Sequence, residues 1–313
     1  MIQRSKKILV VGLGVLGTSY IKAIRYLNLP TEVYMLDNDP KKKEKVYNNT
    51  KMVKFFYIND IKKLKNKINL VIISTTANKR FELVKKIEKI KPDSWIIEKL
   101  IEQSVNSTNK MFKILKNKKC WINVPRRALR EYEKLKLEFN KNKEYPLEIS
   151  SNLRGDRIVT NLIHLVDILS WFRGVKIKNI DISGLNNFWS ESKREGYYDV
   201  GGKLIVIMTD FSKIIIKTSK KGNGQIKITN KIKSWTIMQT KKIALNTNGD
   251  KIRVCNPQVS IIMIKIIKQI LLEKKSKLPT FKDIIFNHNI CTKFLKTHWY
   301  KCTGKKLKYL PVT

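Results

Sequence analysis

Cysteine is scarce in this chain of 313 residues, and its four copies are isolated. Cys120, Cys255, Cys291 and Cys302 form no C-x-x-C pair. Disulfide frameworks and zinc sites use cysteines at regular spacings, so the sequence indicates neither of them. The chain is long enough for two domains with sizeable cores, so it should fold without such cross-links. This cysteine usage fits a reducing cytoplasm, which is where we expect the protein to reside.

Acidic residues are also few, with 25 Asp and Glu against 65 Lys and Arg, giving a formal net charge of +40. Such a charge attracts polyanions, including nucleic acid, membrane surfaces and phosphorylated small molecules. The lysines are, however, spread along the whole chain beside abundant Asn and Ile, and these three residue types share A/T-rich codons. Codon bias therefore explains much of the charge. No RRM, KH or zinc-finger motif is present, so we expect no specific nucleic-acid partner.

Long uninterrupted apolar runs are absent. The strongest stretch after the N-terminus, 259–272, contains Lys265 and Lys268, and it fits an amphipathic helix rather than a membrane span. The N-terminus, MIQRSKKILVVGLGVLG, has the basic and apolar parts of a signal peptide, but its three regularly spaced glycines indicate a different role. We therefore expect no membrane span.

Those glycines form the motif G-x-G-x-x-G. Residues 7–24 run from a short apolar strand through Gly12, Gly14 and Gly17 into a helical pattern. In dinucleotide-binding folds the first glycine allows a tight turn, the second lets the backbone approach a pyrophosphate, and the third allows close packing of helix and strand. The motif alone is weak evidence, but here it has the required strand and helix around it.

An acidic residue strengthens this prediction. Asp37 ends the next apolar strand, 20 residues beyond Gly17, where its carboxylate would bond the ribose hydroxyls of NAD. A 2′-phosphate would fit badly against that carboxylate, which favours NAD over NADP. Lysines at 41–43 could compensate, so NADP stays possible.

Strand and helix patterns then alternate as far as residue 100. Apolar strand patterns occupy 53–58, 69–74 and 94–100, and helix signals occur near 40–47, 59–67 and 80–90. This alternation predicts a parallel sheet that binds ligands at the carboxyl ends of its strands. Ser74, Thr75, Thr76 and Asn78, which end or follow one of these strands, should therefore line the cofactor cleft.

A polar stripe marks the helical segment IVTNLIHLVDILSWF at 158–172. Thr160, His164 and Asp167 fall at i, i+4 and i+7 on one face, with Asn161 beside them, while the other faces are apolar. A histidine there is either a hydrogen-bonded core residue or part of a site, and the segment alone does not decide between them.

The second half of the chain is rich in short β-strand patterns separated by turns such as 222–224 and 246–250. These patterns predict an antiparallel sheet, one face of which could cover the helix at 158–172. A terminal helix over 278–299 carries His288 and His298. These histidines lie ten residues apart without nearby acidic partners, so they are poor metal ligands, and we predict no metal site.

Taken together, these motifs resemble the Gfo/Idh/MocA family of NAD(P)-dependent oxidoreductases. The stretch NLVIISTTANKR is similar to the family's strand that ends in A-T-P-x-x-x-H, IIEKLI to its E-K-P segment, and IHLVDILSWFRG to its H-x-x-D-x-x-x-W helix. The resemblance covers essentially the whole chain. It implies an α/β protein in which an N-terminal Rossmann domain with a parallel sheet, residues 1–123, binds NAD(P). Residues 124–313 would form an α/β domain with an open, mostly antiparallel sheet that binds substrate and forms a homo-oligomer, and the terminal helix could pack back on the first domain.

The resemblance also implies site residues. Lys99 and His164 take the places of the family's catalytic lysine and helix histidine, which handle the reacting oxygen and its proton. The implied cofactor-binding set is Gly12, Gly14, Val15, Leu16, Gly17, Asp37, Asn38, Ser74, Thr75, Thr76, Asn78, Glu98 and Lys99.

Three departures from the family pattern put its standard mechanism in doubt. Thr160 stands where many members carry an aspartate, and it cannot act as a general base near neutral pH. Leu100 replaces a proline, so the turn is either altered or held by a non-proline cis bond. Arg80 replaces a histidine.

Two further stretches, 120–136 and 190–202, resemble a subgroup encoded with bacterial surface-polysaccharide and nonulosonate-sugar genes. Guanidinium groups suit the capture of phosphate or carboxylate, although Lys-Arg pairs in so basic a chain are more often solvated surface. The candidate substrate-binding residues are Arg126, Arg127, Thr160, Asn161, Lys193 and Arg194, with Tyr132 a further possibility.

We therefore predict an NAD-dependent oxidoreductase, with NADP possible, that transfers hydride between nicotinamide and a carbon of a sugar or sugar nucleotide in surface-glycan biosynthesis. One alternative is an epimerase or eliminase that uses NAD without net redox change. Another is a non-catalytic sensor of sugars or nucleotides, because a fold does not fix a function.

Overall fold

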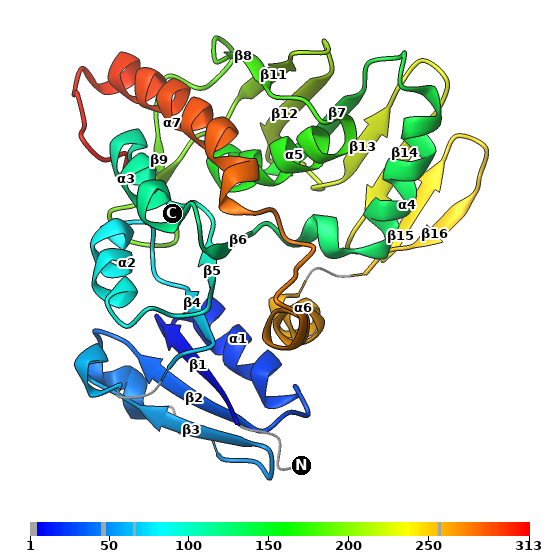
Figure 1. Ribbon diagram of the computed structural model, residues 1–313. Coiled ribbons are helices and arrows are strands. Elements are labelled where there is room, and N and C mark those ends of the chain that lie inside the picture. The colour runs from blue at the N-terminus through cyan, green and yellow to red at the C-terminus, as the bar shows by residue number, and fades with distance from the viewer. Residues whose placement is uncertain (1–4, 45–47, 65–66, 256–257) are drawn as a thin grey trace. The chain divides into compact units, whose positions relative to one another are not determined.

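The structure, a computed structural model, describes residues 5–44, 48–64, 67–255 and 258–313 (Figure 1). These residues form two compact units. Unit 1 contains the described residues within 1–102, 107–125 and 257–283, and unit 2 contains those within 103–106, 126–256 and 284–313. Among the described residues, no helix has both the length and the apolar character needed to cross a bilayer.

Unit 1 is built on a six-stranded parallel sheet with the strand order β3-β2-β1-β4-β5-β6. The strands are β1 (Lys6–Val11), β2 (Thr31–Leu36), β3 (Val53–Tyr57), β4 (Leu70–Ile73), β5 (Ser94–Glu98) and β6 (Lys119–Asn123). All residues of β4 and β5 are buried. Burial on both faces explains why these strands read as continuous apolar runs, since helices cover parallel sheets on both sides. The order 3-2-1-4-5-6 is that of a Rossmann fold, as predicted.

The helices of this unit are α1 (Val15–Arg25), α2 (Arg80–Glu88), α6 (Val259–Glu273) and most of α3 (Val105–Leu115). Helix α6, distant in sequence, packs against α1 (Figure 1). The helix predicted over 59–67 is wrong in the described part, 59–64, because only a 3-10 turn, Ile61–Lys63, forms there; residues 65–66 lie outside the described residues. The Asp60 side chain caps that turn, and Leu64 is already extended. The signal near 40–47 corresponds to a second 3-10 turn, Pro40–Glu44, while 45–47 lie outside the described residues.

Unit 2 contains an eight-stranded sheet with the order β16-β15-β14-β13-β7-β12-β11-β8. Every neighbouring pair is antiparallel except β7 with β12, so the predicted open and mostly antiparallel sheet is confirmed. Its strands are β7 (Glu148–Arg154), β8 (Ile177–Asp181), β11 (Lys203–Met208), β12 (Lys213–Ser219), β13 (Ile226–Thr229), β14 (Ser234–Met238), β15 (Ile243–Asn246) and β16 (Lys251–Arg253). A short hairpin, β9 (Ser190–Glu191) and β10 (Tyr198–Asp199), lies outside this sheet.

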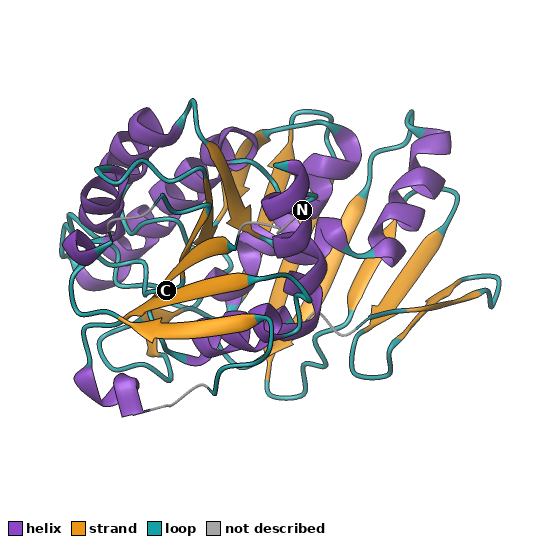
Figure 2. Cartoon of the chain, turned by 60° about the horizontal axis from the view of Figure 1, so that its bottom comes forward, coloured by secondary structure: helices purple, strands orange, loops and turns teal. Residues whose placement is uncertain are grey.

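Unit 2 also contains the helices α4 (Arg130–Phe139), α5 (Ile158–Arg173) and most of α7 (Phe281–Thr303), which begins in unit 1. Figure 2 shows the helices and strands of the chain in separate colours. Helix α5 packs against β7 and β12, whose side chains alternate between buried and more exposed. It ends at Gly174, which adopts φ +73° and donates its N–H to the Ser170 carbonyl. His288 and His298 are both buried in α7, and the described residues contain no group of three or more His, Cys, Asp or Glu suited to a metal ion.

Candidate functional site

The glycine loop joins β1 to α1 in unit 1, and its geometry requires two of the three glycines. Gly12 has φ +90°, and a Cβ on it would lie 2.8 Å from the Thr75 backbone nitrogen. A Cβ on Gly17 would lie 1.8 Å from the Gly12 carbonyl oxygen. Gly14 differs, because a Cβ there would meet nothing within 4 Å. The loop is therefore folded tightly on itself and leaves open space over Gly14.

Asp37 lies against this loop. Its Oδ2 accepts a 2.5 Å hydrogen bond from the Leu13 N–H, and its Oδ1 accepts one of 2.9 Å from the Asp39 N–H. Strands β1 and β2 are paired in parallel, so their carboxyl ends share one edge of the sheet. This position beside the glycine loop is consistent with the prediction that Asp37 bonds the ribose of NAD, which stays a prediction.

The first turn of α1 faces the same edge. Gly14 caps this helix without a side chain, and Val15 is 79% exposed. The first N–H groups of a helix have no acceptor within it, so they are available to an anion such as a pyrophosphate. Leu16 is half-buried in this turn, and Asn38, after Asp37, is exposed.

The residues after β4 divide into two kinds. The Ser74 hydroxyl donates to the carbonyl oxygens of Gly12, at 2.7 Å, and Val11, at 3.0 Å, so it fastens the glycine loop from inside the fold. Thr75 and Thr76 are half-buried and Asn78 is exposed, which leaves these three accessible at the strand edge. A cofactor contact is thus better suited to them than to the Ser74 side chain.

Arg80 joins the loops that follow β4 and β5. Its side chain is buried, with 1% of the residue exposed. The guanidinium donates to the Glu98 carbonyl oxygen at 2.6 Å and to the Ile101 carbonyl oxygen at 3.1 Å, and it also bonds the carbonyl oxygens of Leu100 and Thr75. The loop that carries Lys99 is therefore tied to the neighbouring loop by one side chain.

Glu98 points into the core rather than toward a ligand. It is 2% exposed, and its Oε1 accepts hydrogen bonds from the Tyr20 hydroxyl at 2.6 Å and the Asn123 amide at 2.5 Å. Burial raises the pKa of Glu98, although these hydrogen bonds and nearby cations oppose the rise. The Glu98 side chain is therefore not placed to contact a cofactor, contrary to the prediction.

Lys99 follows Glu98 and is half-buried. The peptide bond between Lys99 and Leu100 is cis. Of the two alternatives that the missing proline raised, an altered turn or a non-proline cis bond, the structure has the cis bond.

These residues of unit 1 fit a dinucleotide. The glycine loop, Asp37, the two threonines and Lys99 all follow strands β1, β2, β4 and β5, which are parallel neighbours, so they gather at one edge of the sheet. The open space over Gly14 could receive a pyrophosphate, and the carboxylate of Asp37 could accept from ribose hydroxyls.

In unit 2, the polar face of α5 is partnered by a residue that sequence reasoning missed. The Thr160 hydroxyl donates to Oδ2 of Asp199, at 2.6 Å. Asp199 also accepts from the N–H groups of Val159, Thr160 and Val200, at 2.8 to 3.1 Å, so it caps the start of α5. Burial raises the pKa of Asp199, and these hydrogen bonds oppose the rise. His164, one turn further along α5, is half-buried.

Asp167, on the same face, forms an ion pair with Arg127. The Arg127 Nε lies 2.8 Å from Oδ2 and its Nη2 lies 2.5 Å from Oδ1, a bidentate arrangement. The Asp167 side chain is only 1% exposed. The guanidinium of Arg127 therefore binds Asp167 within unit 2, and this pairing disfavours the predicted contact between Arg127 and substrate.

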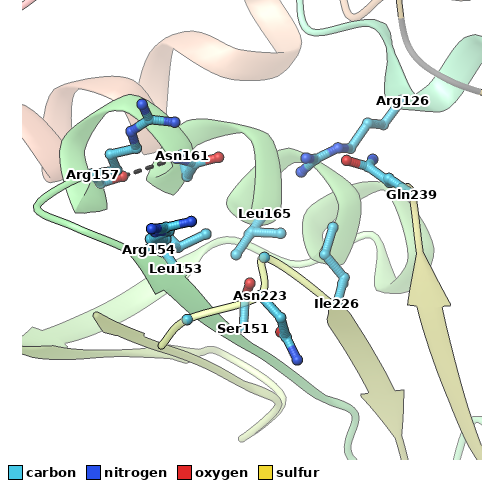
Figure 3. A pocket seen from close by; sticks show the side chains of 12 residues that line it. Arg126, Ser151, Leu153, Arg154, Arg157, Asn161, Leu165, Asn223, Ile226 and Gln239 are labelled. Carbon is cyan, nitrogen blue, oxygen red and sulfur yellow. Dashed lines mark hydrogen bonds between the residues drawn. The ribbon is translucent and has the colours of Figure 1, made fainter. Parts of the chain in front are cut away.

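The other predicted substrate residues are dispersed. Arg126 and Asn161 line one cavity of unit 2, together with Arg154 and Arg157, which sequence reasoning missed although both precede α5 in the stretch SNLRGDR (Figure 3). Lys193 and Arg194 are exposed between β9 and β10 and do not line it. Tyr132 is fully buried in the core.

The sheet order and the glycine loop define a Rossmann dinucleotide-binding protein. Residues 6–125 match the model of the NAD-binding Rossmann fold of the Gfo/Idh/MocA oxidoreductase family. This is the family that the sequence motifs resemble, and the match covers the Rossmann region, residues 6–125.

Solved structures share the fold of the whole chain at low identity. An oxidoreductase from Thermotoga maritima is 14% identical, with a TM-score of 0.71 over 93% of this chain and 96% of that chain. Scyllo-inositol dehydrogenase from Lactobacillus casei, solved with NAD(H) and scyllo-inositol, is 15% identical, with a TM-score of 0.68 over 95% of both chains. UDP-N-acetylglucosamine 3-dehydrogenase from Acidithiobacillus ferrooxidans is 10% identical, with a TM-score of 0.68 over 95% and 98%. No curated protein matches the sequence significantly.

Proposed function

We propose that this protein is a dehydrogenase or reductase that uses NAD, or NADP, to oxidise or reduce a hydroxyl or carbonyl carbon of a sugar or sugar nucleotide. The observation that carries the proposal is the glycine loop bonded to Asp37, because that arrangement suits a dinucleotide and its ribose. The similar folds of an inositol dehydrogenase and a UDP-N-acetylglucosamine dehydrogenase support a sugar as the class of substrate.

The roles of the residues follow from the chemistry of alcohol oxidation. A bound nicotinamide would supply the acceptor for the hydride that leaves the carbinol carbon, and the substrate hydroxyl would lose its proton to a base of the protein. Lys99, at the carboxyl edge of the sheet, is suited to hydrogen-bond the reacting oxygen. His164, half-buried on the polar face of α5, has a side chain that can take the proton near neutral pH.

The resemblance of 120–136 and 190–202 to proteins of surface-polysaccharide genes supports a further proposal, that the sugar is destined for a surface glycan. The positive net charge of the chain attracts anions, which is consistent with an acidic or nucleotide-linked sugar.

Cofactor binding is tested with the variant Gly14→Val. Gly14 has φ −68°, which any residue adopts, and its added atoms begin in open space, so the fold should be kept while the approach of a pyrophosphate is blocked. We expect an unchanged melting temperature and a loss of roughly tenfold or more in NADH affinity by fluorescence titration. Equal affinity in both proteins would contradict this placement of the cofactor.

Catalysis is tested on a panel of inositols, sugar phosphates and sugar nucleotides, with NADH absorbance as the readout. Lys99→Met and His164→Ala, both assayed at saturating NADH, should lose most of the turnover, and His164→Ala should bind NADH like the wild type. Full turnover in both variants would refute their assignment. Turnover that proceeds without net NADH change would favour the epimerase or eliminase alternative, and cofactor binding without any isotope exchange would favour the sensor.

A further inference from the structure

The cavity beside α5 in unit 2 has the size of a small-molecule site. Its volume is about 440 Å³, and ligand pockets commonly span roughly 300–1,000 Å³. It lies between the first half of α5, the turn at Pro125–Ala128 and the strands β7, β13 and β14 (Figure 3). Asn161 and Leu165 reach it from a face of α5 next to the one that carries His164.

Three arginines line this cavity, and none of the described residues that line it is acidic. Arg154 and Arg157 are exposed at one side, and Arg126 points from the other side toward the middle (Figure 3). Like charges gathered in this way repel one another, which an anionic ligand would relieve. Arg127 differs from these three arginines, because its positive charge is paired with the carboxylate of Asp167.

Arg126 carries a second indication of a ligand. Its Nη1 is buried and has no hydrogen-bond partner among the described residues. A buried donor of a cationic group without an acceptor is costly, and such groups normally find one. An oxyanion in the cavity would provide that acceptor, and a planar guanidinium suits the oxygens of a phosphate.

The remaining lining can recognise an uncharged part of a ligand. Asn161, Asn223 and Gln239 present amide groups, and Ser151 presents a hydroxyl. The loop that holds Asn223 lies directly on β7, because a Cβ on Gly222 would come within 2.2 Å of the Leu153 carbonyl oxygen. The cavity is also larger than a bare phosphate requires, so we expect a ligand that combines an anion with hydroxyl groups.

We propose that this cavity binds the phosphate or diphosphate group of a phosphorylated sugar. This proposal rests on the proposed function, since it narrows the sugar substrate to a phosphorylated or nucleotide-linked one. Arg126, Arg154 and Arg157 bind the phosphate oxygens, and the amide side chains bind hydroxyl groups of the attached sugar.

The test measures binding of glucose 1-phosphate, UDP-glucose, inorganic phosphate and uncharged glucose to the full chain by calorimetry. Saturating NADH is present, so that the cofactor site does not take up the phosphorylated probes. The variant is Arg154→Met with Arg157→Met, and because both side chains are exposed, the double replacement should leave the core intact. The matched control is Arg130→Met, at an arginine of unit 2 that is also exposed and does not line the cavity.

We expect at least one of the two phosphorylated sugars to bind more tightly than phosphate or glucose. The double variant should weaken that binding by roughly tenfold or more, and Arg130→Met should leave it unchanged. Equal losses in the double variant and the control would show attraction by general charge and overturn the proposal. Binding of neither phosphorylated sugar by the wild type would also overturn it.

The same measurements separate this inference from the proposed function. NADH binding and turnover of an uncharged sugar, with no effect of the double variant, would refute the cavity proposal and leave the dehydrogenase intact. If the protein bound phosphorylated sugars through Arg154 and Arg157 but bound no NAD(H), the cavity proposal would stand and the dehydrogenase proposal would be refuted.

Discussion

Replacing Arg80 with methionine tests how the loop that carries Lys99 is held. Methionine roughly keeps the length and apolar stem of the side chain but removes all its donors. The change therefore deletes the hydrogen bonds to the carbonyl oxygens of Thr75, Glu98, Leu100 and Ile101 while keeping most of the packing.

The magnitude follows from these bonds. Three of the four acceptors share Nη1, which has two N–H groups, so at most three full hydrogen bonds are made. Hydrogen bonds to charged groups contribute about 1.5–3 kcal/mol each, so three would sum to about 4.5–9 kcal/mol. The cost of burying the guanidinium offsets part of this sum, and removing one partner of a buried charged network typically destabilises by about 3–5 kcal/mol. We expect Arg80→Met to lower the unfolding free energy of unit 1 by about 3–5 kcal/mol, a large part of a domain's usual 5–15 kcal/mol.

The assay must report on unit 1 alone, because a chain of two units need not unfold in one transition. Hydrogen exchange of the β4 and β5 amides in increasing urea provides that readout. Arg80→Lys should lose part of the stability, since an ammonium lacks the planar fork of a guanidinium. Arg25→Met, at an exposed arginine of α1, is the control and should change stability by less than about 0.5 kcal/mol. A loss below about 1 kcal/mol in Arg80→Met would refute the reasoning.

Three further predictions concern other parts of the chain. Arg127→Met removes the bidentate partner of the buried Asp167 and should destabilise by about 3–5 kcal/mol; adding Asp167→Asn should recover part of that loss in a double-mutant cycle. Partial burial of Asp210 opposes a low pKa, but hydrogen bonds from Arg173 and from a neighbouring serine outweigh it and lower the pKa. Its stabilising contribution is therefore present above the unfolded pKa of about 3.9 and is lost as pH falls through the folded value. Asp210→Asn should flatten the acid side of the melting-temperature profile. Gly17→Ala would place a Cβ 1.8 Å from a loop carbonyl oxygen, so we expect loss of both NADH binding and stability, seen by titration and thermal melting.

The features that could be predicted from sequence are those fixed by short-range patterns. An apolar run followed by correctly spaced glycines predicted β1, the loop and α1, and the packing around Gly12 and Gly17 explains that spacing. The strand over 69–74 was recognisable because burial on both faces leaves a continuous apolar signature. The helix prediction failed over the described residues 59–64, because the two apolar residues there cannot anchor a helix and a single capped turn forms instead.

Partners far apart in the sequence could not be predicted in the same way. Asp199 contacts Thr160 across 39 residues, and Arg127 contacts Asp167 across 40. Both pairs depend on how a hairpin or a turn packs against α5, which the spacing of residue types does not show. The cavity arginines Arg154 and Arg157 were missed for a related reason. In so basic a chain a local pair of arginines carries little information until the fold shows that a third one faces them.

The partner of Thr160 changes the meaning of the missing carboxylate on α5. Asp199 is 5% exposed, already accepts three backbone N–H groups, and lies 2.6 Å from the Thr160 hydroxyl. An aspartate at 160 would bring a second carboxylate against this buried one, and two such groups at hydrogen-bond distance cannot both be ionised without a large cost. The threonine hydroxyl donates a hydrogen bond where a second carboxylate would repel. Thr160 therefore suits the buried Asp199, and the proton-handling group that we propose for this face of the helix is His164 rather than a carboxylate in the family position.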